Sequence, residues 1–235
     1  MSGTERERAA SPPSRTWALL AIIGVFSRAV AITLELVLLF AFPDWEQRLE
    51  RAGSTGIVVT FAVGAVGVST LLTLLFSTVS FLGWLYYAVR RAHTYGIPHP
   101  NVTPGGAIVC WFIPFINVVR PYTVVRSLYD VTRAHVPEPP DTWLDRRAKQ
   151  LLVAWWCSWL LGTALTDLAI RWSDRSTGAS VGWLGVVGVP LLLVAAALVA
   201  SIVWRIQRNQ EAVAAAALAA ENAYAHFQAP VASAR

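Results

Sequence analysis

Three charged side chains lie within long apolar stretches of the chain: Arg28, Glu35 and Asp167. Arg28 and Glu35 are seven residues apart, so on a helix they share a face and lie about 10 Å apart along its axis. Charged groups inside a membrane-spanning helix are rare and often mark proton or ion pathways. The trio therefore predicts either a proton or ion relay or an ion-pair network that fixes helix packing. A local pair of Asp167 with Arg171, four residues on, is a further interpretation.

A second candidate lies in the segment CWFIPFINVVRPY, which contains Trp111, Pro114, Asn117 and Pro121. Each proline removes a backbone donor and disfavours helical geometry in the residue before it. Asn117 then has two interpretations. Its amide and the exposed carbonyls bind a ligand, as discontinuous segments do in transporters, or the amide satisfies those carbonyls.

No motif for catalysis or cofactor binding accompanies these residues. The four histidines are isolated, both cysteines lie in apolar runs, and HExxH, GxSxG and phosphate-cradling glycine loops are absent from the sequence. We therefore expect no enzyme activity, no cofactor and no metal site.

The composition is that of a membrane protein. The 235 residues are 55% hydrophobic and 14% charged, whereas a soluble domain has about 25% charged residues. The net charge of +5 comes from basic residues that flank the apolar runs. A lipid bilayer is therefore the expected partner, and nucleic acid is not.

Four apolar runs are long enough for membrane-spanning helices, which need about 20 residues each. They predict an all-α integral membrane fold, a four-transmembrane-helix bundle over residues 17–204. The first run is longer than the roughly 7–15-residue core of a signal peptide, so we expect it to remain in the protein. The expected spans are residues 17–42, 61–85, 151–170 and 181–203.

The distribution of basic residues predicts the orientation of these spans. Fourteen Lys and Arg side chains fall on the side of the two termini, and four fall on the other side. Because cytoplasmic loops are enriched in Lys and Arg, we expect both termini in the cytoplasm. Residues 1–16 are then a disordered cytoplasmic tail. Residues 205–235 are a cytoplasmic tail that begins as a helix and ends disordered.

Residues 105–119 do not cross the membrane in this arrangement. Crossing would place six basic residues of the following connection outside, and the segment is short for a span. We expect a broken re-entrant or interfacial segment that enters from the cytoplasmic side and turns near Pro114. Residues 121–134 follow as an amphipathic surface helix, with apolar residues such as Val124 on one face and charged residues such as Arg126 on the other.

Small residues recur at helical spacing in the second, third and fourth spans. In membranes, such residues let two helix backbones approach closely. The contacts that they serve lie either within the chain or between copies of it. These residues are Ala65, Ser69, Thr73, Ser77, Ser158, Gly162, Thr166, Gly182, Gly185 and Gly188.

Four segments carry a family resemblance: FLGWLYYAVRRAHTYG, WFIPFINVVRPYTVV, LLVAWWCSWLLG and RIQRNQ. Their order and content resemble an uncharacterised actinobacterial family of four-helix membrane proteins, a domain-of-unknown-function family with a WFxPxxNxxxPY motif. The resemblance covers roughly residues 60–210. This chain departs from it at Arg91, where the family tends to carry Asn. The resemblance implies a multi-pass protein of a bacterial plasma membrane, and it transfers no activity.

These features predict a membrane-embedded interaction or scaffold protein, whose partner is another protein or a second copy of the chain. The alternative is a small transporter or channel component that uses the intramembrane charges and the Pro–Asn break. Transport requires polar groups along a continuous cavity, whereas a scaffold has a packed interior with polar groups at its ends.

Overall fold

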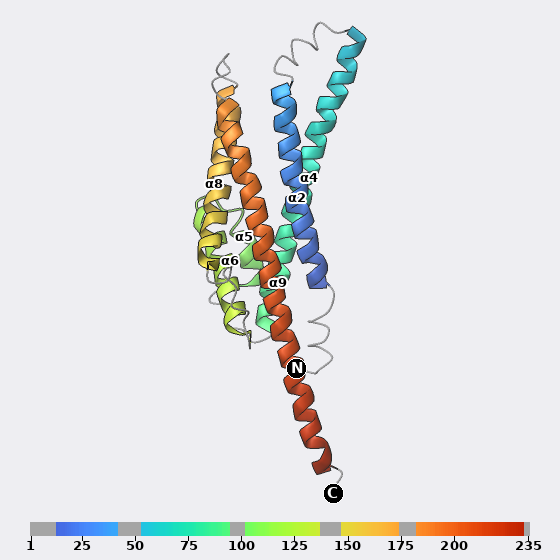
Figure 1. The fold of residues 1–235 in the computed structure, drawn as a ribbon, viewed down its shortest axis with the longest axis vertical. Helices are drawn as coiled ribbons and strands as arrows, with labels where there is room; N and C mark the ends of the chain where they lie inside the picture. Colours follow the sequence, from blue (N-terminus) through green and yellow to red (C-terminus); the bar gives the residue numbers. More distant parts are fainter. Residues whose placement is uncertain (1–12, 42–52, 95–101, 137–146, 174–181, 233–235) are drawn as a thin grey trace. The chain divides into compact units, whose positions relative to one another are not determined.

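The computed structural model describes residues 13–41, 53–94, 102–136, 147–173 and 182–232, and this part of the chain is helical without strands. Figure 1 shows the helices coloured along the chain. They are α2 (Pro13–Ala41), α4 (Gly53–Thr94), α5 (Pro104–Val109), α6 (Ile116–Ala134), α8 (Ala148–Ser173) and α9 (Gly182–Ala232). The expected all-α fold is confirmed.

Four of these helices are long and apolar enough to cross a membrane. The candidate spans are Arg15–Glu35, Thr60–Thr94, Ala148–Ala169 and Leu184–Tyr224. By helix length and composition, the chain is a multi-pass membrane protein. The helices α4 and α9 have 42 and 51 residues. At about 1.5 Å per residue, both are longer than the ~30 Å hydrocarbon core, so each extends beyond it.

Both expected tails fall partly on helices. The helix α2 begins at Pro13, before the expected start of the first span, and α9 runs from its span to Ala232. The alanine-rich sequence after Arg208 favours this continuation, because alanine has the highest helix propensity. Residues 1–12 and 233–235, which belong to the parts of the tails for which disorder is expected, lie outside the described residues.

The chain divides into two compact units, which are described separately. The first, called the span unit here, contains Leu19–Leu82 and Gln150–Ala200. The second, called the end unit, contains Met1–Ala18, Gly83–Lys149 and Ser201–Arg235.

In the span unit, small residues bring α2 against α4 and α8 against α9 (Figure 1). A Cβ placed on Gly24 of α2 would lie 2.9 Å from the Ser77 Cα of α4. A Cβ placed on Gly188 of α9 would lie 2.7 Å from Thr166 Oγ1 and 3.2 Å from the Gly162 carbonyl oxygen of α8. These small residues therefore serve helix contacts within the chain.

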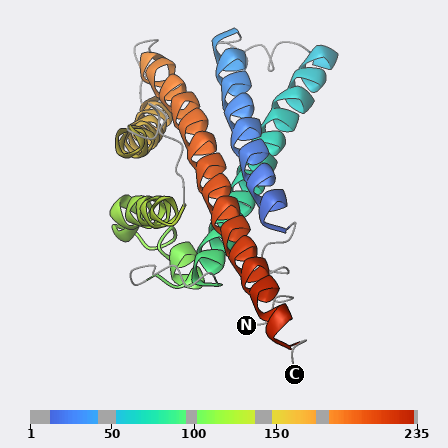
Figure 2. The same ribbon diagram turned by 60° about the horizontal axis from the view of Figure 1, so that its bottom comes forward.

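The end unit has a core that α4, α6 and α9 share. Its buried side chains include Trp84 of α4, Leu128 of α6 and Ile206 of α9. Figure 2 shows α5 next to the C-terminal end of α4. At this point His93 Nε2 lies 3.0 Å from the Val102 carbonyl oxygen. Val102, which leads into α5, is thus held against the end of α4.

The helical backbone is interrupted between α5 and α6. The helix α5 has Thr103 as its N-cap, and the Thr103 hydroxyl accepts a hydrogen bond from the Gly106 N–H at 3.0 Å. Residues 110–115 then form turns, and α6 begins at Ile116. Residues 105–119 therefore do not form one continuous helix.

The sequence predicts that the helix after the break starts at Pro121. In the structure α6 begins earlier, at Ile116. The Ile116 N–H donates to the Pro114 carbonyl at 2.8 Å, and the Asn117 N–H donates to the Ile113 carbonyl at 2.9 Å. These bonds build a first turn ahead of Pro121. Since proline has no N–H, the Asn117 carbonyl lacks its usual helical donor. Pro121 lies buried inside the helix.

Candidate functional site

In the span unit, Arg28 and Glu35 of α2 are joined through one residue of α4. Arg28 Nη1 donates a hydrogen bond to the Thr70 backbone carbonyl at 3.2 Å. The Thr70 hydroxyl donates to Glu35 Oε2 at 3.4 Å. Both charged side chains are half-buried. The two charges thus lie on one side of α2, and both are held against α4.

Asp167 of α8 is exposed, and it forms no hydrogen bond or ion pair with any residue that the structure describes. Arg28 and Glu35 interact through Thr70, an uncharged residue that the sequence analysis did not select. The structure thus connects Arg28 and Glu35 through Thr70. A network that also includes Asp167 remains a prediction.

The motif residues surround the break between α5 and α6. Trp111 and Asn117 are half-buried, Pro114 is exposed and Pro121 is buried. The Asn117 Oδ1 atom is buried and has no hydrogen-bond partner in the described part of the chain. Since Oδ1 is an acceptor, it cannot serve the carbonyls that the prolines leave without a donor, and both interpretations of the Asn117 amide stay predictions. An unsatisfied buried acceptor costs free energy, and a donor from a ligand or a water molecule would remove that cost.

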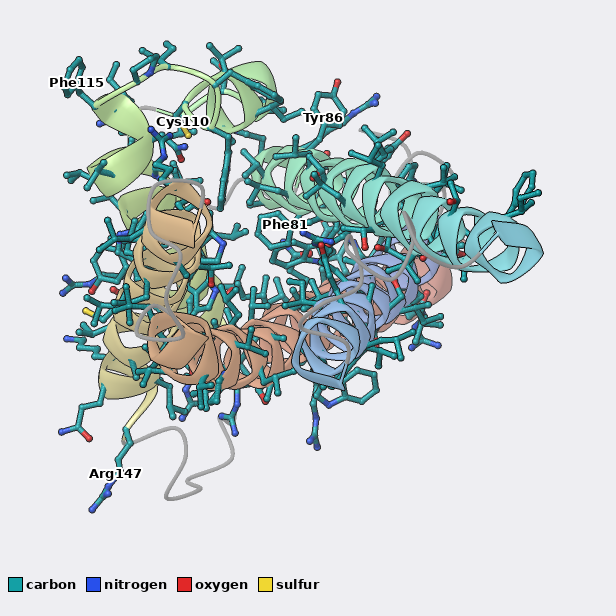
Figure 3. The ribbon with its side chains drawn as sticks, turned by 90° about the horizontal axis from the view of Figure 1, so that it is seen from above. Phe81, Tyr86, Cys110, Phe115 and Arg147 are labelled. Atoms are coloured by element: carbon teal, nitrogen blue, oxygen red, sulfur yellow. The ribbon has the colours of Figure 1, made fainter. Side chains whose placement is uncertain are left out.

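Cys110 precedes the motif beside the turn that joins α5 to α6 (Figure 3). It is buried, and its Sγ donates to the Ala107 carbonyl at 3.2 Å. Burial raises the pKa of the Cys110 thiol, while the positive charge of Arg120 acts in the opposite direction. The thiol is therefore protonated at neutral pH and is a poor nucleophile.

A polar cluster that the sequence analysis did not select lies in the end unit. Glu211 of α9 accepts two hydrogen bonds from Arg15 of α2, at 2.7 Å from Nε and 2.9 Å from Nη2. Gln207 Nε2 donates to the same carboxylate at 2.8 Å. Gln210 is fully buried, and its Nε2 donates to the Ala88 carbonyl of α4 at 2.7 Å. These contacts join the start of α2 and the end of α4 to α9.

The sequence signal for this cluster is the spacing of polar residues after the fourth apolar run. Gln207, Gln210 and Glu211 are three and four residues apart, so a helix presents them on one side. Arg91, at the end of α4, is only 5% exposed, and its charge acts on Glu211. A bidentate ion pair together with buried amides fixes the positions of the helices that carry them.

No metal centre stands out in the described residues. No group of three or more His, Cys, Asp and Glu side chains that could hold a metal ion occurs among them. A shallow depression of about 290 Å³ lies on the surface of α6 alone, where Arg126 and Asp130 form an ion pair at 3.7 Å. Its lining residues are Thr123, Arg126, Ser127, Asp130 and Val131.

Four long apolar helices, charges within a span and a polar cluster at helix ends define a multi-pass α-helical membrane protein. A family model described as a domain of unknown function (DUF4328) matches residues 57–208, more than half of the chain. The protein belongs to the DUF4328 family. No curated protein and no solved structure matches the chain.

The matched region begins within α4 and ends within α9. It contains the motif residues around Pro114 and also Asp167. Arg28 and Glu35 lie outside it, because all of α2 precedes residue 57.

Proposed function

We propose that this DUF4328 protein is a membrane-embedded interaction or scaffold protein without enzyme activity, and that α4 binds a helix of a partner within the bilayer. The observation that carries this proposal is the difference between two faces of α4 in the span unit. One face packs against α2, and the face beside it is exposed and contains two glycines.

The face of α4 that packs against α2 carries Thr70 and Ser77, seven residues apart. Thr70 interacts with Arg28 and Glu35. Ser77 lies at the close approach of Gly24. The polar and small residues on this face are thus occupied by contacts within the chain.

The exposed face beside it, called the outer face of α4 here, follows the i, i+3, i+4, i+7 spacing of one helix side. Its residues are exposed, and a Cβ on either of its glycines would meet no neighbouring atom within 4 Å. A glycine inside a helix costs about 1 kcal/mol relative to alanine, so lipid contact alone does not favour it. Close approach of a second helix does favour it. The residues are Gly64, Gly67, Val68, Leu71 and Leu75.

Replacing Gly67 by leucine is expected to weaken partner binding about tenfold, because an added side chain in a close contact costs 1–3 kcal/mol. The measurement is photo-crosslinking in intact cells with a photoreactive amino acid at Val68. We expect a discrete adduct in the parent protein and its loss in Gly67→Leu. An adduct of twice the chain mass identifies a second copy as the partner.

Ala164→Leu is the matched control, because it enlarges an exposed small residue on α8. This variant should give the same adduct as the parent protein. Crosslinking at Val68 to lipid only, with no protein adduct, would contradict the proposal.

We also propose that the protein lies in the plasma membrane of a bacterium, an actinobacterium by the resemblance of its motif, with both termini in the cytoplasm. The excess of basic residues on the side of the termini supports this orientation. Reporter fusions after residues 49, 140, 176 and 235 test it. The fusions at 140 and 235 should be cytoplasmic and those at 49 and 176 external. An external reporter at 140 contradicts the four-span orientation.

A small transporter or channel component is the second candidate function. The contacts of Arg28, Thr70 and Glu35 favour it, because they link two charges and a hydroxyl between α2 and α4. Such linked polar groups in a span are typical of proton and ion pathways.

A further inference from the structure

An exposed apolar surface lies at the break between α5 and α6 in the end unit. Six large apolar side chains within residues 112–119, called the tip here, are between 40% and 91% exposed. Large apolar groups that gather on a surface mark contact with a partner or a membrane. They are Phe112, Ile113, Phe115, Ile116, Val118 and Val119.

Phe115 is held outward by a strained backbone. It has φ 65° and ψ −43°, and it is the one non-glycine residue with positive φ in the described part of the chain. The hydrogen bond from the Ile116 N–H to the Pro114 carbonyl closes a γ-turn around it. A γ-turn with positive φ is rare and costs free energy in a residue with a side chain. Phe115 is nevertheless 91% exposed and points away from the helices in Figure 3.

The exposed surface of α6 changes from apolar to polar along the helix. Its first turn exposes Ile116, Val118 and Val119, and the exposed residues of the next two turns are Arg120, Thr123 and Arg126. From Ile116 to Arg120 the helix rises about 6 Å. This length matches the 5–10 Å to which interfacial helices bury their apolar groups below the lipid headgroups.

We propose that the tip inserts into the acyl boundary of one bilayer leaflet and that Arg120 binds the phosphate of an anionic phospholipid at its base. Arg120 is exposed and forms no ion pair with any described residue, whereas Arg126 is already paired with Asp130. The apolar tip matches lipid chains, and the cation next to it matches a lipid phosphate. Two of the four candidate spans, Thr60–Thr94 and Leu184–Tyr224, continue into the end unit, so the protein itself brings this unit to a bilayer. This inference does not depend on the outer face of α4.

The test uses the full chain in lipid nanodiscs with both native cysteines replaced by serine. An environment-sensitive fluorophore is attached through Phe112→Cys on the tip or, as the matched control, through Thr123→Cys on the polar surface of α6. Nitroxide-labelled lipids report insertion, and aqueous iodide reports exposure to water. Discs of neutral phosphatidylcholine are compared with discs that also contain phosphatidylglycerol.

The probe at 112 is expected to be quenched by shallow nitroxide lipids and protected from iodide, and the probe at 123 should show the reverse. Phosphatidylglycerol should increase insertion at 112, and Arg120→Gln should reduce that increase about fivefold, the contribution of one basic residue at an anionic surface. Phe115→Gly removes the aromatic ring and relieves the strain, so it should lower insertion without lowering the thermal stability of the protein.

Three results would overturn the proposal. Equal iodide quenching at 112 and 123 means that the tip lies in water. Protection at 112 from both iodide and nitroxide lipids means that protein covers it. Insertion that is equal in both lipid compositions and unaffected by Arg120→Gln means that Arg120 does not recognise anionic lipid.

Discussion

Replacing Arg28 by leucine is expected to lower the free energy of unfolding by about 2–4 kcal/mol. The substitution removes the hydrogen bond to the Thr70 carbonyl and the positive charge nearest to Glu35 on α2. Among the residues that the structure describes, Glu35 then keeps only the Thr70 hydroxyl as a hydrogen-bond partner, and an uncompensated charge within a span is costly. Thermal unfolding in detergent, followed by fluorescence-detected size exclusion, measures the loss.

Two further variants show whether the loss of stability comes from removing the positive charge of Arg28. Arg28→Lys keeps a cation on α2 and should lose less stability than Arg28→Leu. Asp167→Asn removes a carboxylate of α8 that has no ion-pair partner among the described residues, so it should not lower the free energy of unfolding. An Arg28→Leu protein as stable as the parent contradicts the structural role of Arg28. If that variant also loses a proton-linked flux in vesicles, the transporter function is supported.

Replacing Gly24 by valine is expected to destabilise the contact between α2 and α4 by about 1–3 kcal/mol. The first atom of the new side chain would lie 2.9 Å from the Ser77 Cα, and backbone cannot move aside as a flexible side chain can. Separation of the helices would also lengthen the bond between Arg28 and Thr70, one turn away. The midpoint of thermal unfolding should therefore fall.

Gly64→Val is the matched control for this prediction, measured on the monomer in detergent so that binding at the outer face of α4 does not contribute. It makes the same chemical change on α4, where a Cβ meets no neighbouring atom within 4 Å. Its unfolding midpoint should equal or exceed that of the parent, since valine has the higher helix propensity. Equal losses in Gly24→Val and Gly64→Val would show that the cost does not come from the contact with Ser77.

The four long helices could be predicted because they depend on local properties of the sequence. Apolar runs of sufficient length, bounded by charged residues, specify helices that bury their backbone hydrogen bonds in lipid. The break near Pro114 is local as well, since proline removes a donor wherever it stands. The start of α6 was harder to predict. Its first turn uses the carbonyls of Ile113 and Pro114, and proline preference alone points to Pro121 instead.

Contacts between distant segments could not be predicted from such properties. Gln210 and Ala88 are 122 residues apart, and the acceptor on Ala88 is a backbone carbonyl that every residue possesses. Thr70 likewise joins Arg28 to Glu35 through its carbonyl and an ordinary hydroxyl. Helical periodicity predicts which side of a helix is polar, but the partner depends on how the helices are placed against one another.

The contacts of α9 also set the order in which the chain completes its structure during synthesis. Arg15 leaves the ribosome 196 residues before Glu211, and Ala88 leaves it 122 residues before Gln210. Trp84 and Ile206 belong to the same core, so the burial of Trp84 is complete only after α9 has been translated. Translation of α9 is therefore the step that closes the end unit. A nascent chain released before Gln207 would leave that core open to membrane proteases and chaperones.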